Sequence, residues 1–107
     1  MSGIDAVFAA LADPTRRTIM GVVARQGGAS ASALARHLPI SRQGVAKHLL
    51  VLEEAGLLSR LRHGREVRYR TRTEPIDEAM AYLAGVAAEW DDRLAALAAL
   101  AAEDDDE

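Results

Sequence analysis

The sequence predicts a mainly α domain of the α+β class, with helices first, one β-hairpin after them and a long helix at the end. Three observations support this prediction. Apolar residues recur at helical spacing in several segments up to residue 55. From residue 57 to residue 72 they alternate with other residues, with the period of two that is typical of strands. From residue 76 to residue 101 they return to a spacing of four and three, which indicates one long helix.

The size and composition of the chain limit what it can be. Its 107 residues suit one domain, and because half of them are hydrophobic they can form a modest core. The sequence has no cysteine, which excludes disulfides, thiolate metal sites and thiol nucleophiles. No apolar run is long enough to span a membrane, and the N-terminal segment lacks the features of a signal peptide, so we expect a cytoplasmic protein.

Charge is distributed unevenly along the chain. Residues 1–73 contain twelve Arg or Lys and five Asp or Glu, whereas residues 74–107 contain one arginine and eleven acidic residues. The formal net charge of −3 therefore hides a basic body and an acidic C-terminal part. This pattern is typical of proteins that bind nucleic acid, although charge alone does not exclude a chance split.

Two helices are predicted at the start of the chain. The first has its apolar residues on one face: Ile4, Val7, Phe8 and Leu11. The second begins at Asp13-Pro14, where Asp13 can cap the helix and Pro14 fits its first position, and it continues to about Arg25. Arg16 and Arg17 lie in its first turn, against the helix dipole. They could contact phosphates, but a solvated pair is the simpler interpretation.

A pair of short helices follows after the turn Gln26-Gly27-Gly28. We expect Ser32 to cap a third helix that ends at Leu38, and Pro39-Ile40 to make a tight connection to a fourth helix over residues 41–55. Two helices joined this tightly indicate a helix-turn-helix, the motif that places its second helix in the major groove of DNA.

The fourth predicted helix, SRQGVAKHLLVLEEA, has one apolar face and one polar face. Ser41 can cap its start and Gly56 can end it. The apolar face consists of Val45, Leu49 and Leu52. The other side of its first two turns carries side chains that suit phosphates and base edges: Arg42, Gln43, Ala46 and Lys47. An ordinary solvated helix face is the alternative for this segment taken alone.

The alternating segments before and after His63-Gly64 predict a β-hairpin with these two residues as its loop. One face carries Val67 and Tyr69 toward the core, and the other carries arginines: Arg68, Arg70 and Arg72. The tip of the hairpin is surrounded by Arg62, His63 and Arg65. We interpret it as a wing, a two-stranded hairpin that places cations on phosphates or in the minor groove. A structural hairpin with solvated arginines is the alternative.

The last predicted helix, which starts at Glu74-Pro75, is longer than the domain needs. Its apolar residues form a heptad seam: Ile76, Met80, Leu83, Ala87, Trp90, Leu94, Leu97 and Ala101. At 1.5 Å rise per residue the helix would extend roughly 40 Å. We interpret the seam, with the first helix, as a dimer interface, although the first half of the helix can also pack on its own domain. The domain would cover residues 1–102, and residues 103–107 would form an acidic tail.

The order of these elements resembles that of the ArsR-type winged-helix repressors of bacteria over nearly the whole chain. The most specific matches are LADPTRR (11–17), VAKHL (45–49) with Leu52, AGL (55–57) and the wing from Gly64-Arg65 to Tyr69. The resemblance implies a homodimer, formed through the first and last helices, that binds a short inverted repeat near a promoter and blocks RNA polymerase.

The metal ligands of the family are not matched in this chain. Its metal-responsive members use cysteines at the start of the third helix, where this chain has Ser30 and Ser32, and hydroxyls do not replace thiolates for soft ions. Other members bind zinc through His and acidic residues on the last helix, but that part of this chain contains no His. His37, His48 and His63 are too far apart in the pattern to share a site. We therefore expect no metal site and no cofactor, and the sequence does not indicate an effector.

We conclude from the sequence that the protein is a sequence-specific DNA-binding transcriptional regulator, most simply a homodimeric repressor on double-stranded operator DNA. The residues expected to contact DNA are Ser41, Arg42, Gln43, Gly44, Lys47, His48, Arg62, His63 and Arg65. The alternative is a winged-helix protein-interaction module, which would not need the cations of the fourth helix and the wing. The sequence shows no paired acids in an apolar context, no activated nucleophile and no phosphate loop, which argues against an enzyme.

Overall fold

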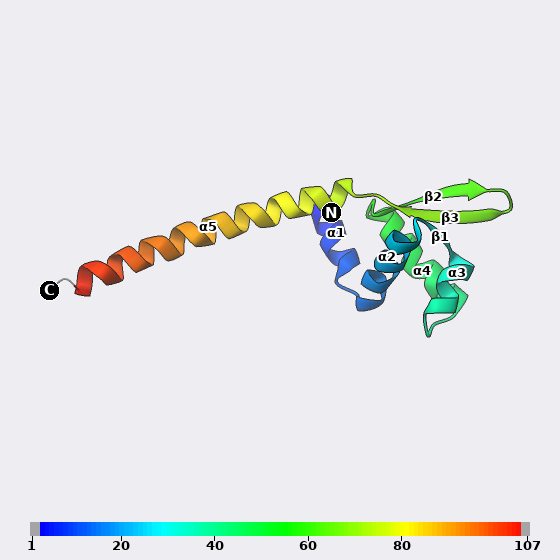
Figure 1. Ribbon diagram of the computed structural model, residues 1–107, viewed down its shortest axis with the longest axis horizontal. Coiled ribbons are helices and arrows are strands. Elements are labelled where there is room, and N and C mark those ends of the chain that lie inside the picture. Colours follow the sequence, from blue (N-terminus) through cyan, green and yellow to red (C-terminus); the bar gives the residue numbers. More distant parts are fainter. Residues whose placement is uncertain (1–2, 106–107) are drawn as a thin grey trace.

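The computed structural model describes residues 3–105, which form five helices and three strands (Figure 1). In chain order these are α1 (Gly3–Leu11), α2 (Pro14–Gln26), β1 (Ala29–Ser30), α3 (Ala31–His37), α4 (Arg42–Glu54), β2 (Leu58–His63), β3 (Glu66–Thr71) and α5 (Glu74–Asp105). Of the expected acidic tail, residues 103–105 continue α5, and residues 106 and 107 lie outside the described part. No helix of the described residues is long and apolar enough to cross a membrane.

Local sequence signals set both ends of α2. The Asp13 carboxylate accepts hydrogen bonds from two backbone N–H groups of the first turn, at 2.7 and 3.3 Å, and Pro14 occupies the first helical position. Gly27 ends the helix in the left-handed conformation, with a φ of 66°, which a residue without Cβ adopts at little steric cost. The predicted capping of this helix by Asp13 and Pro14 is thereby confirmed.

The start of α3 differs from the prediction. Ser30, not Ser32, is the N-cap, and its Oγ accepts a hydrogen bond from the backbone N–H of Ala33 at 3.1 Å. The chain before the helix is extended because Ala29 and Ser30 pair with β3, so α3 starts directly after this short strand. The helix then ends at His37, one residue earlier than expected.

The three strands form one antiparallel sheet in the order β1-β3-β2. Strands β2 and β3 are the predicted hairpin, but His63 pairs with Glu66, so the two-residue loop is Gly64-Arg65 rather than His63-Gly64. Gly64 has a φ of 65° at the first loop position, where type II′ hairpin turns favour glycine. Strand β1 was not predicted, because two residues are too few to show an alternating pattern.

One hydrophobic core joins all of these elements. Each of them contributes at least one buried side chain, and the largest fully buried aliphatic side chains belong to Ile19, Leu34, Leu49, Leu52, Leu57 and Leu58. The predicted apolar face of α4, Val45, Leu49 and Leu52, is confirmed as buried. Because α4 is fixed to the core along its apolar face, its opposite face has a defined direction.

Helix α5 packs on the body through its first part and then extends away from it (Figure 1). Ala79 is buried, Ile76 packs against the core, and the Tyr82 ring lies 6.1 Å from the Phe8 ring of α1. The expected packing of the first half is confirmed, but Ala79 lies inward while the seam residue Met80 is 62% exposed. Residues 87–103 are all exposed, and the molecule measures 75 × 25 × 25 Å.

Candidate nucleic-acid interface

The exposed face of α4 begins at its capped N-terminus. The Ser41 Oγ accepts a hydrogen bond from the backbone N–H of Gly44 at 3.0 Å, which confirms the predicted cap. Val45 and Leu49 are buried, so the helix cannot rotate without uncovering the core. The side chains on the other side are all exposed: Arg42, Gln43, Ala46 and Lys47. The Gln43 amide can form hydrogen bonds with base edges, and the cations beside it can contact phosphates from the same face of the helix.

Helices α3 and α4 form the predicted helix-turn-helix. They pack against each other, and Ile40 of their connection packs against the core. The first turn of α4 contains no acidic residue, so nothing in it repels a phosphate from the positive end of the helix dipole. The start of α4 is therefore suited to approach nucleic acid.

Six arginines lie between residues 58 and 72, and the structure divides them into two groups. Three are bound by other parts of the protein: Arg60 by Glu53, Arg68 by the Gly28 carbonyl and Arg72 by Glu74. The other three have no hydrogen bond or ion pair within residues 3–105: Arg62, Arg65 and Arg70. The second group is available to a ligand. It contains both wing arginines of the predicted set and adds Arg70, which the alternation pattern had placed away from the tip.

The strand register shows which way these side chains face. Arg60 pairs with Tyr69 and Arg62 pairs with Val67, so Arg60 and Arg62 share one face of the hairpin. Arg60 reaches Glu53 of α4, which places α4 on that side of the wing. Arg62 therefore lies on the side of the hairpin that faces α4, closer to the wing tip than Arg60.

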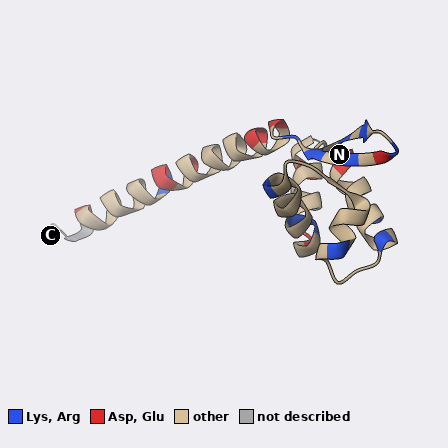
Figure 2. Cartoon of the chain, turned by 45° about the vertical axis from the view of Figure 1, so that its right-hand side comes forward, with Lys and Arg blue, Asp and Glu red and all other residues tan. Residues whose placement is uncertain are grey.

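The nine predicted residues form two groups rather than one patch. Six lie on or next to the start of α4, and three lie at the wing tip. Figure 1 shows the helix-turn-helix and the wing at the end of the molecule away from the C-terminal end of α5. Figure 2 shows cations on the body and wing and acidic residues along α5, as the charge distribution predicted. The cations in both groups suit a negatively charged ligand that reaches from the start of α4 to the wing tip.

His48 is half buried and lies against α2. Its Nδ1 is 3.4 Å from Nη1 of Arg16. The interpretation of Arg16 and Arg17 as a solvated pair holds only for Arg17, which is exposed, because Arg16 is half buried. Both donate hydrogen bonds to backbone carbonyls at the end of α1, Arg16 at 2.6 and 3.2 Å and Arg17 at 2.7 Å. The carbonyls at the end of a helix lack partners within it, and the turn between α1 and α2 brings them next to these arginines.

Two ionisable groups near the interface have shifted pKa values. Desolvation alone would raise the pKa of the Asp13 carboxyl, but hydrogen bonds from the N–H groups of Arg16 and Thr15 and the charge of Arg16 outweigh it and lower the pKa. The hydrogen bonds to Glu53 raise the pKa of Arg60. The fold therefore favours the charged form of both groups.

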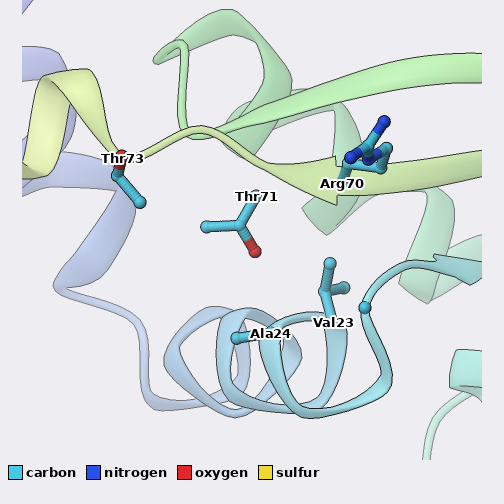
Figure 3. Close-up of a pocket in the computed structure, with 6 residues that line it drawn as sticks. Val23, Ala24, Arg70, Thr71 and Thr73 are labelled. Carbon is cyan, nitrogen blue, oxygen red and sulfur yellow. The ribbon is translucent and has the colours of Figure 1, made fainter.

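Two cavities of the structure lie apart from the predicted residues. One of about 280 Å³ is lined by Val23, Ala24, Gly27, Arg70, Thr71 and Thr73 (Figure 3). Its Thr71 side chain is directed from β3 toward α2, and the buried Thr71 Oγ1 has no hydrogen-bond partner among the described residues. Another of about 270 Å³ lies between α1 and α4. In the described part of the chain, no three His, Asp or Glu side chains gather as metal ligands would.

Both the sequence and the fold are similar to those of known proteins. A family model described as a helix-turn-helix domain matches residues 11–60. The transcriptional repressor SdpR of Bacillus subtilis is 30% identical over 88 residues, which are 82% of this chain and 97% of SdpR.

Solved structures of transcriptional regulators are also similar to this chain in fold and in sequence. An ArsR-like transcriptional regulator from Rhodococcus sp. RHA1 superposes with a TM-score of 0.80 and 44% identity, covering 89% of each chain. The homodimeric winged helix-turn-helix DNA-binding domain Mb0332 from Mycobacterium bovis superposes with a TM-score of 0.65 and 28% identity, covering 81% of this chain and 80% of that domain.

Proposed function

Because this chain belongs to the ArsR family of winged helix-turn-helix transcriptional regulators, we propose that it represses transcription as a homodimer bound to a short inverted repeat. The proposal rests on the presence of two surfaces in the same molecule, each suited to nucleic acid. One is the capped, exposed polar face of α4, and the other is a wing tip whose arginines have no partner in the described residues. The relative SdpR is a transcriptional repressor, which supports repression as the outcome.

In this proposal α4 enters the major groove with its N-terminal residues toward the base edges. Gln43 pairs with an adenine, which an amide can bond through N6 and N7 together. Arg42 and Lys47 bond guanine or phosphate, and Ser41 and Gly44 bring the backbone at the start of the helix close to the phosphates.

The wing contacts the DNA beside the major groove. Arg62, His63 and Arg65 lie on phosphates or in the minor groove and add affinity that depends little on sequence. Arg62 extends from the same face of the hairpin as Arg60, which contacts α4, so helix and wing approach one duplex from the same side.

The long helix α5 provides the dimer interface. Its seam residues Met80, Leu83, Trp90, Leu94 and Leu97 are between 51 and 62% exposed in the single chain. A continuous row of large exposed apolar side chains is typical of an interaction site. A helix whose apolar residues follow a heptad spacing can pack against a second copy of the same helix. The homodimeric state of the Mycobacterium bovis domain supports this. A two-fold dimer presents two α4 helices to half-sites one helical turn of DNA apart, which is why we propose an inverted repeat.

A footprint on the promoter upstream of the protein's own gene tests the proposal. The expected result is protection of one symmetric segment and a decrease of transcription from that promoter when the protein is added in vitro. Protection without symmetry would contradict the dimer on an inverted repeat. An increase of transcription would contradict repression while leaving DNA binding intact.

A further inference from the structure

Arg16 connects three elements of the body. Its Nε donates to the Ala10 carbonyl at 2.6 Å and its Nη2 to the Ala9 carbonyl at 3.2 Å, both at the end of α1. Its Nη1 lies 3.6 Å from the carboxylate of Asp13, which caps α2. The same Nη1 lies 3.4 Å from Nδ1 of His48 on α4. The Arg16 side chain is only 17% exposed, so its guanidinium is held in one place.

These contacts determine the tautomer of His48. A guanidinium remains protonated in proteins and can only donate hydrogen bonds. The Nδ1 atom of His48 must therefore be the acceptor, and the ring proton lies on Nε2. Since Nδ1 is directed at Arg16, the Nε2–H faces away from the junction of α1 and α2.

We propose that Arg16 is a positioning residue for DNA binding, which holds the imidazole of His48 with its Nε2–H toward a phosphate of the DNA backbone. His48 lies in the second turn of α4, next to the exposed Lys47, where a donor suits the backbone rather than a base edge. This inference rests on the proposed function, and it adds that α1, a helix of the proposed dimer interface, is tied to α4 by one side chain.

A double-mutant cycle on the full chain tests this link, with operator affinity as the readout. In the wild-type background Arg16→Gln should lower the affinity about tenfold. A decrease of this size is expected when one hydrogen bond to a charged group is lost. In a His48→Ala background the same change should lower it less than about twofold, because the group that Arg16 positions is absent. Equal decreases in both backgrounds would overturn the proposal.

Arg17→Gln is the matched control, because Arg17 also donates to a carbonyl at the end of α1, that of Leu11, but forms no hydrogen bond or ion pair with α4 among the described residues. It should leave operator affinity nearly unchanged. A decrease equal to that of Arg16→Gln would mean that capping of α1, and not the position of His48, causes the effect, and would overturn the proposal.

The tautomer gives a second readout, which is taken on the wild-type protein and does not depend on operator affinity. Ring ¹⁵N chemical shifts of the wild-type protein, with the His48 signals identified from their disappearance in His48→Gln, should show the proton on Nε2. A proton on Nδ1 would overturn the Arg16 contact. A wild-type protein that prefers no DNA sequence would overturn the proposed function and the DNA role of His48 with it, while the ring shifts would still decide the contact.

Discussion

The Arg60 guanidinium of the wing and the Glu53 carboxylate of α4 form a bidentate ion pair, with N–O distances of 2.9 and 3.0 Å. Glu53 lies in the last turn of α4 and Arg60 in β2, so the pair joins the exposed helix of the helix-turn-helix to the hairpin that follows it. The guanidinium carbon also lies 6.0 Å from the centre of the Tyr69 ring. The position of the wing relative to α4 therefore depends on a contact between the two elements that carry the candidate interface.

We expect Glu53→Gln to weaken operator binding several-fold, because the amide cannot replace the two charge-assisted hydrogen bonds that orient Arg60. Thermal stability should change little, since Arg60 is exposed and exposed ion pairs contribute little to folding. Glu54→Gln removes the neighbouring exposed carboxylate, which has no partner within the described residues, and serves as the control. Equal affinities of the two variants, measured by fluorescence anisotropy, would argue against a positioning role for the ion pair.

Leu94→Glu should convert the dimer to monomers and greatly weaken operator binding, because it places a charge inside the heptad seam. Leu94 is exposed in the single chain, so the monomer itself should stay folded. Ala96→Glu adds the same charge on the opposite side of the helix and should leave the dimer intact. Sedimentation at micromolar concentration checks both variants, and a monomeric wild-type protein would rule out the proposed interface.

Operator binding should not respond to zinc, arsenite or cadmium. The chain has no cysteine and no His after residue 63, so soft ions find neither thiolates nor imidazole on α5. Titration of each ion into the protein–operator complex measures this directly. Release at stoichiometric metal, reversed by a chelator, would reveal a site that the sequence does not indicate.

Asp13→Ala should lower the melting temperature at pH 7, because it removes the N-cap of α2. The pKa of Asp13 is lowered in the folded state, so its carboxylate stabilises the fold at neutral pH. The stabilisation by the Asp13 carboxylate is lost as the pH falls below 3.8, the ordinary pKa of the group, and then through its lower pKa in the folded state. The melting temperatures of wild type and variant should therefore converge below that pH, whereas Asp13→Asn, which keeps an acceptor, should stay closer to wild type at pH 7. A constant difference at all pH values would contradict the carboxylate as its cause.

Signals that act within a few residues were predictable from the sequence. The caps at Asp13 and Ser41, the apolar face of α4 and the existence of the hairpin all follow from local hydrogen bonding and periodicity. The exposed polar start of α4 followed from the same pattern, because a fixed apolar face determines the direction of the other face.

Features that depend on contacts between distant segments were not predictable. Strand β1 exists because residues 29 and 30 pair with β3, and this pairing also moved the cap of α3 to Ser30. The hairpin loop shifted by one residue to Gly64-Arg65, since alternation alone does not set the register. The roles of Arg16 and Arg60 depend on partners in other elements, so composition indicated the cations but not which of them the protein itself binds.

In the proposed function α4 selects the DNA sequence, and the wing binds the phosphate backbone of the DNA. Gln43→Ala should cost roughly 1–3 kcal/mol per half-site on the operator and relax the preference at one base position, with little effect on non-specific DNA. Arg65→Ala should weaken binding to all DNA alike. It should also reduce the slope of log affinity against log salt by about 0.9 for each phosphate that the variant no longer neutralises.

A salt series with both variants on operator and scrambled duplexes is the most direct test. We expect Gln43→Ala to lower affinity for the operator alone, with an unchanged salt slope, and Arg65→Ala to lower both affinities with a reduced slope. The opposite assignment of the two effects would reverse the roles of helix and wing. Variants that bind every duplex as the wild type does would contradict DNA binding through these surfaces and favour a protein partner instead.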